Sequence, residues 1–75
     1  MDIKILNESK SEIEVEIGSL TLVELIRVYL NKDSNVTFAA WKRDHPSRNP
    51  ILKVVAKDAK KAINSAIESA IKDLD

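Results

Sequence analysis

The chain has 75 residues, no cysteine, one histidine and one glycine, and its twelve basic and twelve acidic side chains balance to a net charge of zero. This length holds one domain, and the composition excludes disulfides, thiolate zinc sites and glycine-rich phosphate loops. A domain this small buries only about 60% of its unfolded surface, so we expect a partner to contribute to its stability.

Charge is unevenly distributed along the chain. Residues 1–26 carry two lysines and six acidic side chains, whereas residues 27–61 carry nine basic and three acidic ones. The basic segment is compatible with nucleic-acid binding. We favour the alternative that acidic and basic strands lie side by side in one sheet, because opposite charges commonly face each other across strands. The side chains expected to lie close together are Glu12, Glu14, Glu16, Lys53 and Lys57.

Two strands are predicted near the N-terminus, over residues 2–6 and 12–17. Apolar residues alternate with glutamates throughout the second strand, which is the period-two pattern of a strand with one buried face. The polar residues 7–11 between the strands predict a turn.

A helix is predicted to begin at Thr21 and to run to about Lys32. Thr21 and Glu24 have the spacing of a capping box, and Leu20 and Leu25 have the positions of a hydrophobic staple around it. The polar residues that follow predict the exit turn.

Two further strands are predicted over residues 36–43 and 51–57, and a proline-containing loop over residues 45–50 joins them. Asp58 is expected to cap a second helix, whose apolar residues recur at three-and-four spacing in one stripe of ordinary width. This element order (ββαββα) predicts a single α+β domain over residues 1–75, with two helices on one face of a four-stranded antiparallel sheet. The stripe comprises Ala59, Ala62, Ile63, Ala66, Ile67, Ala70, Ile71 and Leu74.

The first helix carries a wider apolar surface than docking on one sheet requires. On a helical wheel its apolar residues cover about 220°, whereas about 100° is sufficient. One half should face the sheet, and the other needs the neighbouring helix or another chain; we favour a protein–protein interface. We expect Leu25 to be the core residue, because it shares the staple with Leu20. The two candidate stripes are Leu22, Leu25 and Tyr29, and Val23, Ile26 and Leu30.

The sequence contains no recognisable catalytic constellation. His45 lies in a loop, and the glutamates of the second strand are typical of a solvated strand face. Phe38 and Trp41 have the composition of a base-stacking site beside Lys42 and Arg43, but core or interface packing is the favoured interpretation. We therefore expect no catalytic, cofactor-binding or metal-binding residues.

The chain has no apolar stretch of the roughly 18 residues that would span a bilayer, and its N-terminus has no signal-peptide core. We therefore expect a soluble protein of the cytoplasm.

Four segments of the chain resemble the archaeal RNA polymerase subunit L family, which includes the Rpb11-type subunits and the dimerisation domain of bacterial α subunits. That family has the same element order, so the resemblance covers essentially the whole chain. The sequence departs from the family at Leu20, Val23, Glu24 and Ser47, where histidine, glycine, asparagine and leucine are usual. The segments are Leu30-Asn31-Lys32-Asp33, Val36-Thr37-Phe38-Ala39-Ala40-Trp41, His45-Pro46 and Pro50-Ile51-Leu52.

The resemblance implies a non-catalytic polymerase subunit. It would pair helix against helix with a larger D-type (Rpb3-like) subunit and, through it, with the large subunits that carry the nucleotidyltransferase chemistry. A homodimer of the isolated chain, little or no direct nucleic-acid binding and no membrane contact are also expected. The expected partner interface comprises Leu22, Val23, Leu25, Ile26, Tyr29, Leu30, Phe38, Trp41, His45 and Pro46.

The alternative is a homodimeric nucleic-acid-binding or regulatory module on the same fold. It would require the basic residues to form one exposed face. These residues are Lys42, Arg43, Arg48, Lys53, Lys57, Lys60 and Lys61.

Overall fold

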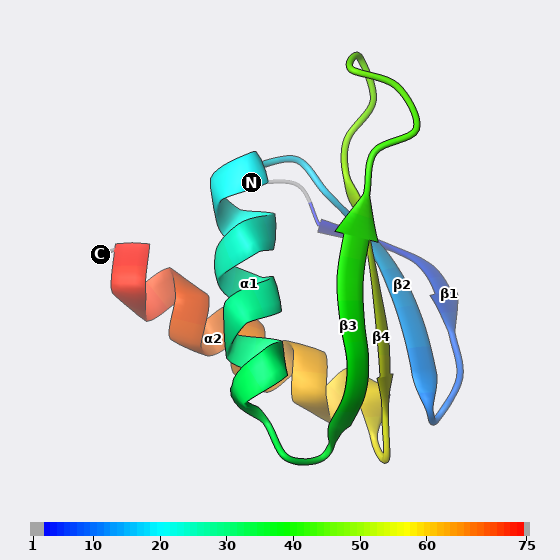
Figure 1. Cartoon of the computed structure of the whole chain (residues 1–75), viewed down its shortest axis with the longest axis vertical. Helices are drawn as coiled ribbons and strands as arrows, with labels where there is room; N and C mark the ends of the chain where they lie inside the picture. The colour runs from blue at the N-terminus through cyan, green and yellow to red at the C-terminus, as the bar shows by residue number, and fades with distance from the viewer. Residues whose placement is uncertain (1–2, 75) are drawn as a thin grey trace.

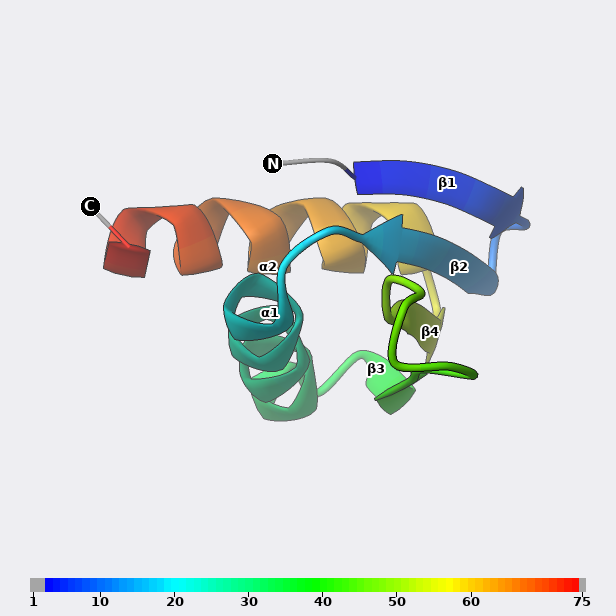
Figure 2. The same cartoon turned by 90° about the horizontal axis from the view of Figure 1, so that it is seen from above.

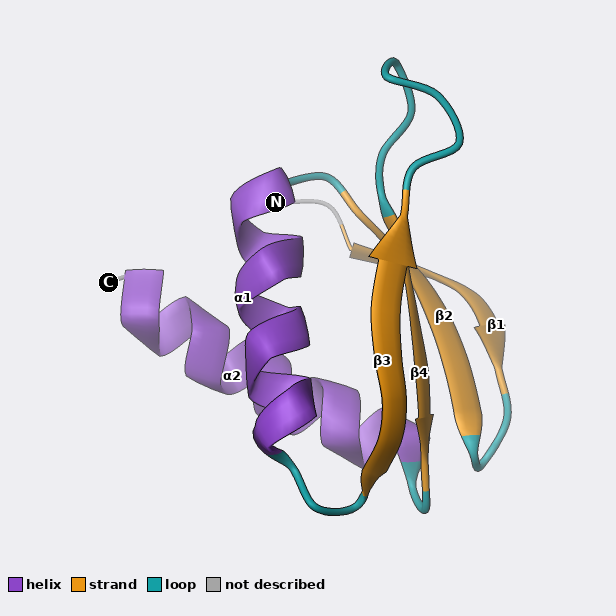
Figure 3. Cartoon of the chain, in the orientation of Figure 1, coloured by secondary structure: helices purple, strands orange, loops and turns teal. Residues whose placement is uncertain are grey.

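Four strands and two helices form two layers in the computed structural model, which describes residues 3–74 (Figures 1 and 3). The strands pair antiparallel throughout, in the order β1-β2-β4-β3. Both helices lie on the same face of the sheet (Figure 2), so the predicted α+β fold is confirmed. The elements are β1 (Ile3–Glu8), β2 (Glu12–Ile17), α1 (Leu20–Lys32), β3 (Val36–Lys42), β4 (Ile51–Ala56) and α2 (Ala59–Leu74).

The alternating pattern of β2 builds the floor of the core. Its isoleucine and valine side chains are buried, whereas its glutamates are only partly covered on the other face. In the register, Ile13 lies opposite Val54 and Val15 lies opposite Leu52. These four apolar side chains are almost fully buried and form one continuous surface on which the helices pack.

Strand β1 continues further than predicted, to Glu8 instead of residue 6. A register shift between Ile5 and Asn7 places a bulge in the strand, and pairing with β2 resumes after it. The turn is therefore shorter, and the backbone N–H of Ser9 donates to the carbonyl of Glu12 at 2.8 Å. The predicted start at residue 2 lies outside the described residues, and β3 and β4 each end one residue earlier than predicted.

The predicted capping box and staple of α1 are wrong, because Ser19 is the N-cap. Ser19 has an extended backbone (φ −141°, ψ 124°), and its hydroxyl accepts a hydrogen bond from the N–H of Leu22 at 3.2 Å. Thr21 therefore lies inside the helix, and Leu20 is its first residue, with 45% of its surface exposed. Ser19 and Thr21 are both suitable N-cap residues, and the spacing to Glu24 favoured the wrong one.

The predicted cap of α2 is confirmed. The Asp58 carboxylate accepts a hydrogen bond from the backbone N–H of Lys61 at 3.2 Å, and the Asp58 carbonyl accepts one from Ala62 at 3.0 Å. From this start α2 packs over β4 and β2, whereas α1 lies mainly over β3 (Figures 1 and 2). Small buried side chains on α2, such as Ala66 and Ala70, allow the two helices to approach each other closely.

Candidate functional site

The wide apolar surface of α1 divides into a buried half and an outward half. The buried half includes the stripe of Val23, Ile26 and Leu30, together with Leu22, and none of these side chains is exposed to solvent. The expectation that Leu25 is a core residue is therefore wrong, since Leu25 is only half-buried at the margin of the core. The staple on which that expectation depended is absent because Ser19 is the cap.

The outward half forms a continuous apolar surface, which we name the α1 outer face and define as Leu20, Thr21, Leu25 and Val28. These residues, with Glu24, line a shallow hollow of about 500 Å³. Leu20 is 45% exposed and Val28 is 37% exposed, which is unusual for large apolar side chains one turn or two apart on the same helix. The surface remains unpartnered after the domain has closed its own core.

One side of the α1 outer face is bounded by a charged contact to β3. Arg27 binds Glu24 through two hydrogen bonds, from Nε at 2.6 Å and from a terminal nitrogen at 3.0 Å. The indole N–H of Trp41 donates to the same carboxylate at 2.9 Å. The hydrogen bond from Arg27, followed by that from Trp41, lowers the pKa of Glu24 from 4.5 to about 2. These contacts connect α1 to β3 beside the hollow.

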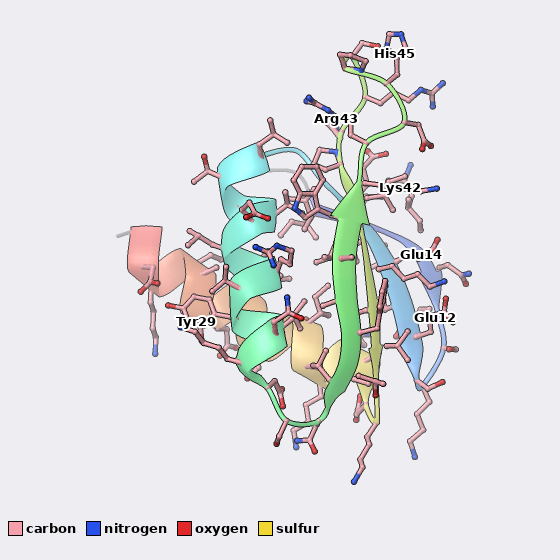
Figure 4. The ribbon with its side chains drawn as sticks, in the orientation of Figure 1. Glu12, Glu14, Tyr29, Lys42, Arg43 and His45 are labelled. Carbon is pink, nitrogen blue, oxygen red and sulfur yellow. The ribbon has the colours of Figure 1, made fainter. Side chains whose placement is uncertain are left out.

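The other side is bounded by a contact between the helices. The phenol O–H of Tyr29 donates to the carboxylate of Asp73 on α2, and this hydrogen bond raises the pKa of Tyr29 (Figure 4). The ammonium group of Lys32 lies 5.4 Å from the centre of the Tyr29 ring, within the range of a cation–π contact. On α2, two residues before Asp73, Ile71 is 41% exposed. An apolar centre with a polar rim is the usual anatomy of a protein–protein interface.

The ten residues expected at the partner interface do not form one surface. Leu22, Val23, Ile26 and Leu30 are in the chain's own core, so a partner does not reach their side chains in this conformation. Leu25 and Tyr29 lie on or beside the α1 outer face, and Trp41 borders it through Glu24.

The remaining three expected residues lie elsewhere. Phe38 is 49% exposed and lines a hollow with Glu14 and Lys53, on the face of the sheet that the helices leave open. His45 and Pro46 are exposed on the loop that projects beyond the sheet, away from α1 (Figures 1 and 4). Of the expected set, Leu25, Tyr29 and Trp41 therefore lie on or beside the α1 outer face. Trp41 also lines the hollow of Phe38 at the edge of the sheet.

The expected interface omitted Leu20, Val28 and Ile71, all of which are exposed. Val28 lies within the apolar arc of the helical wheel, so its signal was present in the sequence. Leu20 has the position of the predicted staple, and Ile71 belongs to a stripe of ordinary width whose members between Ala59 and Ala70 are largely buried.

The charged strands pair as expected at one lysine and not at the other. Lys53 lies 3.0 Å from the carboxylate of Glu12 and opposite Glu14 in the register, and the hydrogen bond to Glu12 raises the pKa of Lys53. Lys57 lies beyond the end of β4, and its backbone N–H donates to the carbonyl of Asn35. Among residues 3–74, no ion pair within 4.0 Å joins Lys57 to these glutamates.

The basic residues are spread along the whole length of β4, with Lys53 between its two ends. Lys42 pairs with Ile51 at the start of β4, whereas Lys57 follows Ala56 at the other end. At about 3.3 Å per residue, five residues of strand separate the two groups by roughly 17 Å. The second group includes Lys60, which lies 3.5 Å from the carboxylate of Glu8. Among residues 3–74, Lys42, Lys53 and Lys60 each lie within 4.0 Å of a carboxylate, which disfavours the free basic face that the nucleic-acid alternative requires.

Within residues 3–74, no cluster of three or more histidine, cysteine or acidic side chains has the arrangement of a metal site. In the same part of the chain, neither helix is long and apolar enough to cross a membrane. The α1 outer face is therefore the strongest candidate site in the described structure.

Comparison with known proteins identifies the family. No curated protein matches the chain. A crystal structure of DNA-directed RNA polymerase subunit L from Thermoplasma acidophilum is similar to it, with 26% sequence identity and a TM-score of 0.78 over 95% of this chain and 75% of that one. The RNA polymerase Rpb3/Rpb11 dimerisation domain matches residues 10–75. The chain therefore belongs to the RNA polymerase Rpb3/Rpb11 dimerisation domain family.

Proposed function

We propose that this chain is a small, non-catalytic, L-type subunit of a DNA-directed RNA polymerase, which acts in the cytoplasm. In this proposal it pairs with a D-type (Rpb3-like) subunit, and the pair is the platform on which the large catalytic subunits assemble. The observation that carries the proposal is the exposed apolar outer face of α1, in a chain whose family is described as a dimerisation domain.

The geometry of the α1 outer face favours a helix as its counterpart. Thr21, Leu25 and Val28 follow four-and-three spacing, which produces a ridge and groove along the helix. Ridges of this kind pack between those of a second helix. Burying Leu20, Leu25 and Val28 against such a helix would stabilise the pair by roughly 25 cal/mol for each Å² of apolar surface removed from water.

The charged groups at the rim of the α1 outer face are already paired within the chain. Glu24 and Arg27 already satisfy each other within the chain, so docking would not leave either charge unpaired. Tyr29 and Asp73 likewise form an internal contact at the helix–helix junction. The partner therefore needs to supply mainly apolar side chains at the centre, with polar groups at the margin.

Co-expression with a tagged D-type subunit tests the proposal. Leu25→Glu combined with Val28→Glu places two carboxylates on the α1 outer face, and we expect capture to weaken at least about 30-fold, the equivalent of about 2 kcal/mol. Phe38→Glu is the matched control, because it makes the same kind of change at an exposed apolar side chain on the opposite face. The assignment of this surface would be contradicted if the D-type subunit captured the double variant as well as it captures the wild type. It would also be contradicted if the Phe38→Glu control lost as much capture as the double variant.

A further inference from the structure

The connection between β3 and β4 projects beyond the end of the sheet (Figures 1 and 4). We define the hairpin tip as residues 43–50. It is longer than the roughly two to five residues that usually join antiparallel neighbours. Every residue from Arg43 to Asn49 is exposed, so this segment contributes nothing to the core, and only Pro50 is buried. Exposed loops held on a rigid scaffold commonly carry binding functions.

Local hydrogen bonds hold the hairpin tip in one shape. The carbonyl of His45 accepts from the N–H of Arg48 at 2.9 Å, and the Nδ1 atom of His45 lies 2.8 Å from the hydroxyl of Ser47. Pro46 and Pro50 further restrict the backbone, since each proline has a fixed φ. The side chains of the tip are therefore presented by an ordered turn, which lowers the entropy lost on binding.

The hairpin tip presents two arginines, Arg43 and Arg48, that form no ion pair within 4.0 Å with the carboxylates of residues 3–74. The one acidic residue of the tip, Asp44, lies 3.7 Å from the ammonium group of Lys42. Two guanidinium groups thus remain available at the end of the molecule, and arginine is well suited to bidentate contacts with carboxylates or phosphates.

Carboxylates fit this surface better than a nucleic-acid backbone does. Duplex binding usually depends on many phosphate contacts along a basic stripe. Here Lys42 beside the tip lies 3.7 Å from Asp44, and Lys53 within β4 lies 3.0 Å from Glu12. Lys57 follows the opposite end of β4, so among residues 3–74 no stripe of unpaired lysines continues from the tip.

We propose that the hairpin tip is a second docking element, distinct from the α1 outer face, which binds a carboxylate-rich protein surface through Arg43 and Arg48. We place that acidic surface on a polymerase subunit other than the D-type partner, and this placement rests on the proposed function. The expected pairing of arginine with carboxylate is independent of the proposed function, because it follows from the residues of the tip.

The first test uses the isolated chain. A twelve-residue glutamate-rich peptide is titrated at low salt while backbone amide shifts are followed by NMR. We expect shifts centred on residues 43–48 that decline with added salt. Arg43→Glu with Arg48→Glu should weaken binding at least about tenfold. Lys57→Glu with Lys61→Glu, the same change of charge at the other end of β4, should leave it unchanged.

Two results of this test would overturn the proposal. One is that the amide shifts are not centred on the residues of the tip, or that both double variants weaken peptide binding equally. The other is binding of a 20-base-pair DNA duplex more tightly than the peptide, with loss in the tip variant, which would assign the arginines to phosphates instead.

The second test places the contact in the assembly. The chain is co-expressed with the D-type and large polymerase subunits, and the complex is purified through a tag on the D-type subunit. We expect the tip variant to be recovered with the D-type subunit at the wild-type level, with severalfold less of the large subunits. Equal recovery of the large subunits would overturn their assignment as partner, whereas loss of D-type pairing by the wild-type chain would instead overturn the proposed function.

Discussion

Glu24 connects two elements of this small domain at its surface. Its carboxylate accepts hydrogen bonds from Arg27 on its own helix and from Trp41 on β3. Glu24 thus connects α1 to β3 at the margin of the proposed interface.

The lowered pKa of Glu24 predicts a particular dependence of stability on pH. Because the folded-state pKa is about 2 and the ordinary value is 4.5, the contribution of Glu24 is fully present above pH 4.5 and is lost as pH falls toward 2. Glu24→Gln should therefore melt at a lower temperature than the wild type at pH 7, and the difference should shrink between pH 4.5 and 2. Glu68→Gln, an exposed residue of α2 that forms no ion pair within residues 3–74, is the control. A difference between wild type and Glu24→Gln that stays constant over this range would contradict the prediction.

The N-cap of α1 makes a second prediction for single residues. Ser19→Ala removes the hydroxyl that accepts the N–H of Leu22, so we expect a loss of about 0.5–2 kcal/mol in the free energy of unfolding. Thr21→Ala lies within the first turn and should change it by less than about 0.5 kcal/mol. Urea unfolding followed by circular dichroism measures both. A larger loss of unfolding free energy for Thr21→Ala than for Ser19→Ala would indicate that Thr21 is the cap.

Helix α1 has two apolar halves, and the positions of β3 and α2 determine which half is buried. The buried half lies toward β3 and α2, and the outward half faces the space that the domain leaves open. Leu20, the first residue of α1, is exposed, so this chain presents an apolar start to the helix. A partner surface that matches it should be correspondingly apolar.

Glutamate substitutions in the two halves should separate folding from assembly. Ile26→Glu places a carboxylate in the core and should cost several kcal/mol, out of the roughly 5–15 kcal/mol that stabilise a small domain. Leu25→Glu keeps its charge in contact with water until a partner covers it. Thermal melts and capture by a D-type subunit measure both effects. We expect Ile26→Glu to unfold and Leu25→Glu to fold normally but to lose capture.

The two alternative outcomes identify which part of the hypothesis fails. If both variants unfold, the outward half is part of the core and the interface hypothesis is wrong. If both fold and still capture the D-type subunit, assembly uses another surface.

Periodicity made some elements predictable and left others open. Strand β2 and helix α2 could be predicted because a half-buried strand or helix repeats its apolar residues with a fixed period. The width of the apolar arc of α1 was also visible, but a helical wheel does not give the direction in which each half points. Only the position of β3 and α2 decides that Ile26 is inside and Leu25 is outside.

The expected interface joined residues that a strand and a loop keep apart. Phe38 and Trp41 are three positions apart on β3, so alternation places them on opposite faces of the sheet. Trp41 consequently reaches Glu24 on α1, while also bordering the hollow that Phe38 lines on the open face. His45 lies in a loop that has no period, and sequence alone did not indicate that the loop projects away from the helices.

For the whole molecule, the chain closes one core and leaves the α1 outer face exposed, and its net charge of zero provides no long-range repulsion between copies. We therefore predict that the isolated chain folds and self-associates reversibly. In sedimentation velocity its apparent mass should rise with concentration, because copies bury Leu20, Leu25 and Val28 against each other. Leu25→Glu with Val28→Glu should remain monomeric, whereas Phe38→Glu should associate as the wild type does.

Addition of a D-type subunit should replace the self-associated form with a heterodimer, since both would use the same surface. A wild-type chain that stays monomeric at the highest attainable concentration would count against this surface, and association that persists in the Leu25→Glu/Val28→Glu variant would assign it to another part of the molecule.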